Sequence, residues 1–408
     1  MKETSTQNIL VIGIDAAALV ASAKRAGYNV FAVDYFGDQD LKQTCKDNLS
    51  IVTQKTGKSC GRLATNFSPT KLLSLAKKLR TMYQMDAALL ASGLEDSPQV
   101  LIRLNELIPI IGNPPRTIEK VRDKAKFFHE LKKLAIHHPE TSVAKNLEEG
   151  KRAAKDIGYP VIIKPLPSLG GVGIRKVNDR SELDLVFQQT ISSSKEVLIQ
   201  EFVSGMNMSV SFLSSKGETE VLTLNEQLLG IQEVGQREPF GYCGNIVPAS
   251  VSGIVTDACI DVAKKIVPHF SLAGSNGIDF VISKDGVPYV VEVNPRFQGT
   301  FECVERVLGI NLVNAHMKAC IEEKLLFHNE EKLTNCCVRL ILYARQRSIA
   351  PNLSSLEKVR DIPLPRVVIE ESEPLCSIIV EEKTRSSALK KSRMLTERVY
   401  GMVKPKLQ

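Results

Sequence analysis

The sequence predicts a mixed fold, α/β in its N-terminal part and α+β in the remainder. Between residues 9 and 52, apolar strands alternate with a helical segment, which is typical of a parallel, doubly wound sheet. Residues 155 to about 320 instead form a block of short strands, two of which meet through a Gly-rich turn. A chain of 408 residues has room for two to four domains, at about 100–200 residues per domain.

The N-terminal region opens with the strand "NILVIGI", the helix "AAALVASAKRAG" and the strand "YNVFAVDYF". Only Gly13 precedes the helix, so the G-x-G-x-x-G pattern of dinucleotide-binding folds is incomplete. Apolar spacing after Ser68–Pro69 predicts a further helix, and "DAALLASGLEDSP" predicts a strand whose carboxyl end leads into a ligand-side loop. The Pro114–Pro115 pair interrupts this pattern, so we place the first domain boundary there.

Composition narrows the class of protein. Hydrophobic residues make up 43% and charged residues 24% of the chain, as in soluble globular proteins. No apolar stretch reaches the roughly 18–20 residues of a membrane span and the N-terminus lacks a secretory pattern, so we expect a cytoplasmic protein without membrane contact. The nine cysteines form no C-x-x-C pair, which predicts reduced thiols, with Cys243 packed rather than nucleophilic. The net charge of +7 is not gathered in an aromatic-interleaved basic motif, so nucleic-acid binding is not expected.

Two strands near residue 285 carry a pair of carboxylates. The segment "GIDFVISKDGVPYVVEVNP" predicts a hairpin closed by Asp285–Gly286, a favoured two-residue type I′ loop. Continuing that ladder places Asp279 opposite Glu292, where the two carboxylates repel each other unless a cation lies between them. Asn294 projects from the same face, and this oxygen set suits Mg²⁺ (or Mn²⁺). Arg296, two residues further on, offers a planar guanidinium to a carboxylate or phosphate. The alternative is a solvated face of an antiparallel sheet without a metal.

Three other segments contain candidates for nucleotide binding. "YPVIIKPLPSLGGVGIRKV" predicts a strand that carries Lys164, a glycine turn whose N–H groups can approach phosphate, and a returning strand. Lys124, in the basic segment after the first domain, offers a second cation. In "EVLIQEFVSGMNMSVSFL" the strand breaks between Glu201 and Gly205, where a flat purine can lie beside Glu201. Each feature alone also fits a simple turn, a surface lysine or an irregular strand.

Taken in order, these elements resemble the ATP-grasp superfamily over roughly residues 115–320. The segments "GYCGNIVP" and "NPRFQGTFECVERVLGINL" are similar to a carboligase-like archaeal-type branch, related to biotin carboxylase and the carbamoyl-phosphate synthase large subunit. The resemblance implies a pre-ATP-grasp Rossmann-like domain (1–115), a two-lobed ATP-grasp domain (116–325) with a lid subdomain at about 155–203, and a small β-rich C-terminal cap (330–408).

The resemblance also implies roles for individual residues. The implied ATP-binding residues are Lys124, Lys164, Gly170, Gly171, Gly173, Glu201 and the backbone of Phe202 and Val203. The implied metal ligands are Asp279, Glu292 and Asn294, the catalytic residue is Arg296, and the candidate contacts to the acceptor substrate are Gln298, Gly299 and Thr300. Two positions depart from the family pattern: Asn207 stands where many relatives have a ribose-binding acid, and Asp279 where many have glutamate.

The function that the resemblance implies is an ATP- and Mg²⁺-dependent ligase that activates a carboxylate as an acylphosphate and joins it to an amine. The amine is an amino acid or a small cofactor precursor, and the chain forms a homodimer if it follows the family. Two alternatives stay open, a bicarbonate-activating carboxylase and a regulatory subunit that binds ATP without catalysis. The sequence does not identify the two substrates.

Overall fold

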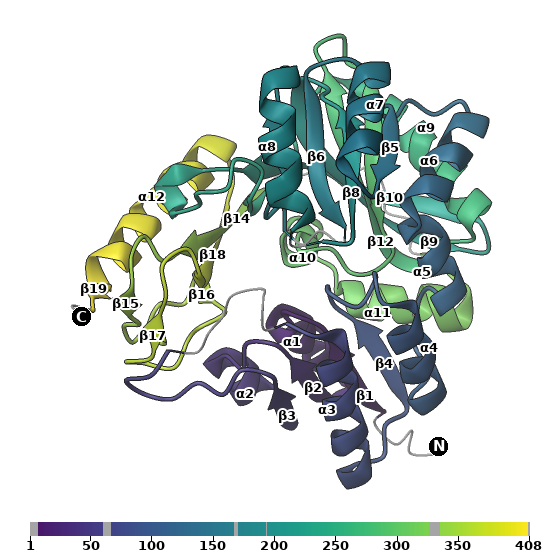
Figure 1. Ribbon diagram of the computed structural model, residues 1–408. Coiled ribbons are helices and arrows are strands. Elements are labelled where there is room, and N and C mark those ends of the chain that lie inside the picture. The colour runs from purple at the N-terminus through teal and green to yellow at the C-terminus, as the bar shows by residue number, and fades with distance from the viewer. Residues whose placement is uncertain (1–6, 60–66, 167–169, 193, 326–334, 407–408) are drawn as a thin grey trace.

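The computed structural model describes residues 7–59, 67–166, 170–192, 194–325 and 335–406. The described residues form four sheets with helices packed on their faces (Figure 1). This mixed arrangement confirms the fold class expected from the sequence. None of the helices within these ranges is both long and apolar enough to cross a lipid bilayer.

The N-terminal sheet is parallel, with the strand order β3-β2-β1-β4. Strand β1 is buried on both faces, because Ile9 and Val11 contact one hydrophobic core while Leu10 and Ile12 contact another. The strands are β1 (Asn8–Ile12), β2 (Asn29–Asp34), β3 (Asp47–Ser50) and β4 (Ala87–Leu90), and the helices are α1 (Ala17–Arg25), α2 (Gln39–Thr44), α3 (Pro69–Met82) and α4 (Pro98–Leu107). Helix α3 therefore begins at Pro69, as the sequence predicted.

Two short helices, α5 (Pro115–Arg122) and α6 (Lys124–Lys133), lead out of the N-terminal sheet. Helix α5 begins at the proline pair, because a proline in the first turn loses no helical hydrogen bond. Asp123 separates the helices and caps the second one, its Oδ1 accepting a hydrogen bond from the Lys126 N–H at 3.2 Å. This break places Arg122 and Lys124 on either side of the cap, and both line the cavity described below.

A small antiparallel sheet follows, with the order β5-β8-β6-β7. Its elements are β5 (Thr141–Ala144), α7 (Leu147–Ile157), β6 (Val161–Leu166), β7 (Arg175–Val177), α8 (Arg180–Ile191) and β8 (Glu196–Glu201). Helices α7 and α8 cover one face, where Val161 and Ile163 pack with Phe187. The other face is left to Ile162 and Lys164, which line the cavity. The alternation along β6 thus separates core residues from cavity residues.

The largest sheet has eight strands in the order β13-β12-β9-β10-β11-β14-β18-β16. The strands are β9 (Gly205–Ser215), β10 (Glu218–Leu229), β11 (Tyr242–Val247), β12 (Gly274–Ser283), β13 (Pro288–Asn294), β14 (Cys336–Tyr343), β16 (Val359–Arg360) and β18 (Pro374–Glu382). Strand β11 pairs directly with β14, so β14, β16 and β18 of the C-terminal segment extend the sheet of the preceding segment.

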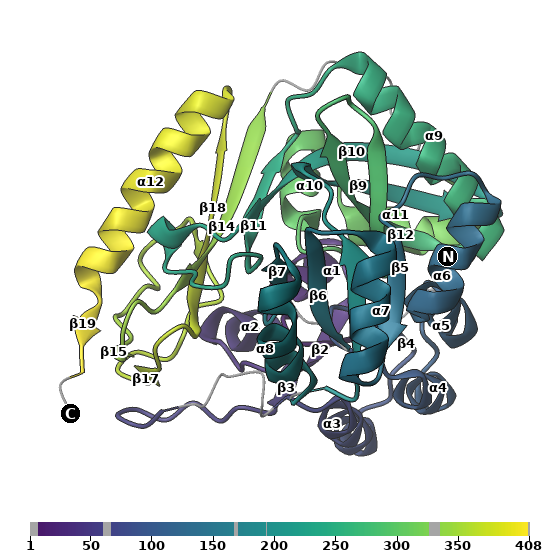
Figure 2. The ribbon, with the colours of Figure 1, turned by 45° about the horizontal axis from the view of Figure 1, so that its top comes forward.

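Helices cover both faces of this large sheet (Figure 2). Helix α9 (Gly253–Phe270) packs on strands β9 and β10, and α12 (Arg385–Met402) packs on β14 and β18. Helices α10 (Phe301–Leu308) and α11 (Leu312–Met317) share one core with α1 of the N-terminal sheet. The remaining elements are η2 (Gln232–Val234), η3 (Lys318–Glu322) and the three-stranded sheet β17-β15-β19 of β15 (Ser348–Ile349), β17 (Val368–Ile369) and β19 (Lys404–Pro405).

The hairpin of β12 and β13 pairs Asp279 with Glu292, as predicted, but by a different route. The predicted two-residue loop is wrong: the Ser283 N–H bonds to the Val287 carbonyl at 2.9 Å, which leaves three loop residues, 284–286. Gly286 has φ +79°, the left-handed conformation that a three-residue loop requires. This loop shifts the ladder by one residue, and a bulge between Asp279 and Phe280 shifts it back. The two changes cancel, so the carboxylate pair forms.

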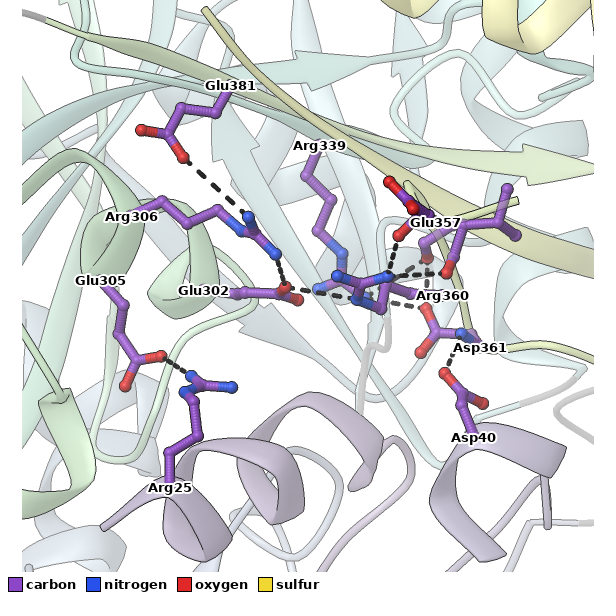
Figure 3. Close-up of polar contacts among 12 residues, drawn as sticks. Arg25, Asp40, Glu302, Glu305, Arg306, Arg339, Glu357, Arg360, Asp361 and Glu381 are labelled. Carbon is purple, nitrogen blue, oxygen red and sulfur yellow. Dashed lines mark hydrogen bonds and ion pairs between the residues drawn. The ribbon is translucent and has the colours of Figure 1, made fainter. Parts of the chain in front are cut away.

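The C-terminal segment also bonds back to the N-terminal unit. The Asp40 carboxylate accepts hydrogen bonds from the N–H groups of Asp361 (2.9 Å) and Ile362 (3.0 Å), and the Gln39 N–H donates to the Ile362 carbonyl at 2.8 Å. Figure 3 shows Asp40 below Asp361 at this junction. These contacts bring β14 close to the carboxyl end of β1, where Arg339 meets Asp15 at 3.1 Å.

Candidate active site

A cavity of about 1650 Å³ lies where the N-terminal sheet, the small sheet and the large sheet meet. Ligand pockets typically measure about 300–1000 Å³, so this cavity has room for a nucleotide and a second ligand. Every candidate residue named from the sequence lines it except Gly173. The structure therefore brings together residues that lie up to 176 positions apart, from Lys124 to Thr300.

One end of the cavity lies at the break between β8 and β9, where the sequence predicted a purine site. Strand β8 ends at Glu201, and its carboxylate accepts a hydrogen bond from the Glu140 N–H at 3.1 Å. The Phe202 N–H donates to the Pro160 carbonyl at 3.2 Å, and the Lys176 ammonium lies 4.1 Å from the centre of the Phe202 ring. The break is thus held in place by contacts from neighbouring segments, and Val203 lines the cavity beside it.

Two lysines from different elements line the cavity. Lys164 of β6 donates to Gln200 Oε1 at 2.7 Å, and burial lowers its pKa to about 8. Lys124, at the start of α6, lies 3.3 Å from Glu292, and its side chain is only 13% exposed. Burial and the neighbouring Arg122 lower the pKa of Lys124 well below its usual value. Buried ammonium groups without full counter-charge favour the arrival of an anion.

The glycine turn after β6 contacts the opposite wall of the cavity. Gly170, Gly171 and Gly173 have φ angles of +58°, +78° and +75°, a conformation that other residues rarely adopt. The Gly170 carbonyl accepts a hydrogen bond from the Tyr242 N–H at 3.0 Å. The Gly173 N–H donates to Glu238 at 3.3 Å, and Glu238 also pairs with Arg175. These contacts join the small sheet to the large sheet at the cavity.

Gly171 and Gly170 form a matched pair for testing this contact. A Cβ on Gly171 would lie 1.9 Å from the Phe240 carbonyl oxygen, whereas a Cβ on Gly170 would have no described atom within 4 Å, its chain neighbours aside. Alanine at either position accepts a left-handed conformation at about 1 kcal/mol, so only Gly171→Ala should separate the turn from the large sheet. We expect the Tyr242 amide, measured by hydrogen exchange, to lose protection in Gly171→Ala and to keep it in Gly170→Ala. Equal protection in the two variants would contradict this account of the contact.

The acidic residues of the hairpin contact cationic and amide side chains. Asp279 Oδ2 accepts from the Asn294 amide at 2.9 Å, and burial raises the Asp279 pKa. Glu292 forms ion pairs with Arg122 and Lys124. In the described part of the chain, no three His, Cys, Asp or Glu side chains gather as metal ligands. The donor set still fits a hard cation such as Mg²⁺, since it offers two carboxylates and an amide and leaves positions for phosphate oxygens and water.

Arg296 lies next to this platform and pairs with a buried carboxylate that the sequence analysis did not select. Its Nε donates to Glu95, whose side chain is only 8% exposed, and its Nη2 lies 3.3 Å from Asn294 Oδ1. Burial raises the Glu95 pKa, but Arg296 and Arg122 outweigh burial and hold that pKa below its usual value. Glu95 lies in the loop after β4, so it fixes Arg296 to the N-terminal sheet.

The predicted acceptor residues Gln298, Gly299 and Thr300 line the cavity just beyond Arg296, and Gln298 Nε2 lies 3.5 Å from Asp279 Oδ1. Gln298 Oε1 accepts from Ser211 Oγ at 2.9 Å, and the Gly299 carbonyl accepts from Arg339 Nη1 at 2.8 Å. Cys243 is a packed thiol, as expected, because its sulfur contacts the Ile231 N–H at 3.2 Å and burial raises its pKa.

Several charged residues of the cavity were not selected by sequence analysis, and five of them form ion pairs at the site. Glu95 and Asp96 fall in a loop that was recognised as ligand-side, and Arg122 lies two residues before Lys124. Arg339 interrupts the apolar strand "CVRLILY", where a lone charge signals a buried partner. Asp15 follows the first strand directly, at the edge where parallel sheets bind ligands.

Comparison with known proteins identifies the family to which the middle of the chain belongs. Residues 121–300, which supply most of the cavity wall, match the family described as the ATP-grasp domain. The chain therefore contains an ATP-grasp domain, as the sequence motifs indicated.

Two of the proteins that share sequence with this chain illustrate the range of matches. A protein of Methanocaldococcus jannaschii, described as uncharacterized, is 29% identical over 382 residues, covering 92% of this chain and 89% of the relative. The carbamoyl phosphate synthase large chain of Methanothrix thermoacetophila is 31% identical over 212 residues, 51% of this chain and 19% of the relative. This chain thus spans about a fifth of that synthase.

Solved structures share the fold across nearly the whole chain. Biotin carboxylase from Campylobacter jejuni has a TM-score of 0.76 at 18% identity, covering 97% of this chain and 91% of that chain. An L-amino acid ligase from Bacillus licheniformis has a TM-score of 0.71 at 16% identity, covering 99% of both chains. At these identities the likeness concerns the fold alone.

Proposed function

We propose that this protein is an ATP- and Mg²⁺-dependent ligase that activates a carboxylate as an acylphosphate and transfers the acyl group to an amine. The observation that carries the proposal is the arrangement of two buried lysines, the Asp279–Glu292 pair and Arg296 around one cavity. Phosphoryl transfer depends mainly on positioning and charge neutralisation, and these residues supply both.

ATP would lie between the small and large sheets. Glu201 and the backbone of Phe202 and Val203 would border adenine, while Lys124 and Lys164 would contact the phosphates under the Gly170–Gly173 turn. Asp279, Glu292 and Asn294 would hold Mg²⁺, which neutralises phosphate charge when bound. Glu292 would exchange its contacts with Arg122 and Lys124 for the metal, and this frees both cations for phosphate oxygens.

The carboxylate substrate would lie between Arg296 and the ATP phosphates. Its oxygen attacks the γ-phosphorus, ADP leaves, and Arg296 stabilises the charge of the acylphosphate and of the later tetrahedral adduct. Gln298, Gly299 and Thr300, just beyond Arg296, would border the acceptor. The fold shared with an L-amino acid ligase supports an amine acceptor.

Two alternatives are separable by experiment. The fold shared with biotin carboxylase supports bicarbonate as the activated carboxylate, and a regulatory subunit would bind ATP without turnover.

The cytoplasmic location and the homodimer that sequence analysis led us to expect remain predictions.

The deciding experiment measures Mg²⁺-dependent ADP release with a panel of carboxylates, bicarbonate included, each with and without a panel of amines. The ligase predicts release that depends on both partners and a product with the mass of an amide. ADP release with bicarbonate alone among the carboxylates would favour the carboxylase. Tight ATP binding without ADP release in any combination would favour the regulatory subunit.

Lys164 gives the site a pH dependence that is measurable without knowing the substrates. Its pKa of about 8 means that the free protein loses this cation as pH rises through 8. ATP affinity should therefore fall above that pH, by at most about tenfold per pH unit, since the neutral amine must regain a proton to bind phosphate. Calorimetric titrations between pH 6.5 and 9.5 test this.

Lys164→Arg is the matched control for this pH dependence. Guanidinium stays charged across the range, so we expect the affinity of Lys164→Arg for ATP to change little with pH. A fall in affinity above pH 8 that is the same in both proteins would assign the titration to another group.

A further inference from the structure

Asp15 is an acidic residue of the cavity wall to which the proposed reaction has assigned no role. It follows β1 at the carboxyl edge of the N-terminal sheet, and its Oδ1 accepts from the Ala17 N–H at 3.3 Å. Its Oδ2 lies 3.1 Å from Arg339 Nη2. The side chain is 31% exposed, and this exposed part faces the cavity.

The charges around Arg339 leave one carboxylate in excess. Arg339 Nη2 lies 3.1 Å from Asp15 and 3.1 Å from Asp361, while Nη1 donates to the Gly299 carbonyl. One guanidinium thus faces two carboxylates, and of the two only Asp15 lines the cavity. A substrate cation next to Asp15 would balance this excess negative charge.

The place of Asp15 in the cavity matches that of an acceptor. Arg339 contacts both Asp15 and the Gly299 carbonyl, so Asp15 lies near a residue that is proposed to border the acceptor. Two other carboxylates of the cavity are already engaged: Glu95 pairs with Arg296, and Asp96 pairs with Arg122 through both oxygens at 2.7 Å.

The surroundings also suit proton transfer. Burial and then Asp361 raise the Asp15 pKa to about 7, although Arg339 opposes them. The charged or titratable groups that face Asp15 are Arg339 of β14, Asp361 beyond β16, Asp38 before α2 and Asp34 of β2. A general base works best when its pKa lies near the operating pH.

Building on the proposed ligase reaction, we propose that Asp15 binds the ammonium group of the amine substrate and is the general base that removes its proton. The Asp15 carboxylate takes one proton from R–NH₃⁺ and leaves a neutral amine. The nitrogen lone pair forms the C–N bond to the acyl carbon, the bond from that carbon to the phosphate oxygen breaks, and inorganic phosphate leaves with the electron pair. The second proton passes from nitrogen to phosphate, which gives the amide and hydrogen phosphate.

Hydroxylamine separates this step from acylphosphate formation. It is largely unprotonated at neutral pH, so it captures an acylphosphate as a hydroxamate without needing a base. With the full chain, ATP, Mg²⁺, a panel of carboxylates and a panel of α-amino acids, Asp15→Asn should keep hydroxamate formation within about twofold and lose amide formation at pH 7 by about 100-fold or more. Amide formation should recover in part towards pH 9, and Asp15→Glu should keep part of it.

Asp361→Asn is the matched comparison: it removes the other carboxylate of Arg339 from outside the cavity and one cause of the raised Asp15 pKa, so it should lower the ratio of amide to hydroxamate by less than about tenfold, far less than Asp15→Asn. Normal amide formation by Asp15→Asn would overturn the proposal, and so would an equal loss of amide and hydroxamate in that variant. The proposal would also fail if Asp361→Asn lost amide formation as strongly as Asp15→Asn does. Wild-type protein that forms hydroxamate but no amide would refute the amine step alone. Wild-type protein that forms no hydroxamate with any carboxylate would refute the ligase function itself.

Discussion

Replacing Glu292 with alanine should abolish Mg²⁺-dependent ADP release while leaving the fold intact. The variant loses one of two carboxylates proposed to hold the metal, and losing about 4 kcal/mol of charge stabilisation corresponds to about 1000-fold in rate. Folding should be preserved because Arg122 keeps both hydrogen bonds to Asp96, each 2.7 Å long, and because the repulsion between Asp279 and Glu292 disappears. ADP release and thermal unfolding, measured on the same preparation, test both statements.

Glu130→Ala is the control for this substitution. Glu130 lies on α6 like Lys124, but it pairs with Lys133 and His269 and does not line the cavity. We expect wild-type rates and an unchanged unfolding midpoint, because exposed ion pairs contribute little to stability. If Glu292→Ala released ADP at the wild-type rate, Glu292 would not be a metal ligand, whatever result the control gives.

Local patterns were enough to predict the elements and most of the candidate site. The apolar strand before Gly13, the proline at the start of α3 and the break after Glu201 act within a few residues, so the sequence shows them directly. The pairing of Asp279 with Glu292 was predicted for a partly wrong reason. The longer loop and the bulge each shift the ladder by one residue, and nothing in the local sequence reveals that they cancel.

What the sequence could not predict depends on contacts between distant segments. Glu95 meets Arg296 across 201 positions, and Asp15 meets Arg339 across 324. Such partners are set by how the sheets pack. A single sequence, taken without an alignment of its relatives, contains no record of that packing. The same holds for the pairing of β11 with β14, which joins the C-terminal segment to the large sheet. An arginine in an apolar strand signals that a partner exists, but the partner's identity comes from the fold.

The pair of Arg296 and Glu95 provides a test that separates catalysis from stability. Arg296→Met removes the guanidinium that faces Glu95, whose side chain is 8% exposed, and leaves a buried carboxylate without its main cation. Breaking a buried ion pair in this way costs about 3–5 kcal/mol. We expect urea denaturation to show a loss of unfolding free energy near the lower end of this range, because Glu95 also accepts a hydrogen bond from the Gly93 N–H and lies near Arg122.

Adding Glu95→Gln to Arg296→Met should restore most of that stability, because a neutral amide can keep the Gly93 hydrogen bond without an unpaired charge. ADP release should stay absent in the double variant, since no guanidinium remains to stabilise the acylphosphate. Glu95→Gln alone leaves Arg296 in place beside Asn294 and should keep measurable turnover. If the double variant recovered turnover together with stability, Arg296 would be a structural counter-ion of Glu95, and the charge on the acylphosphate would need another partner.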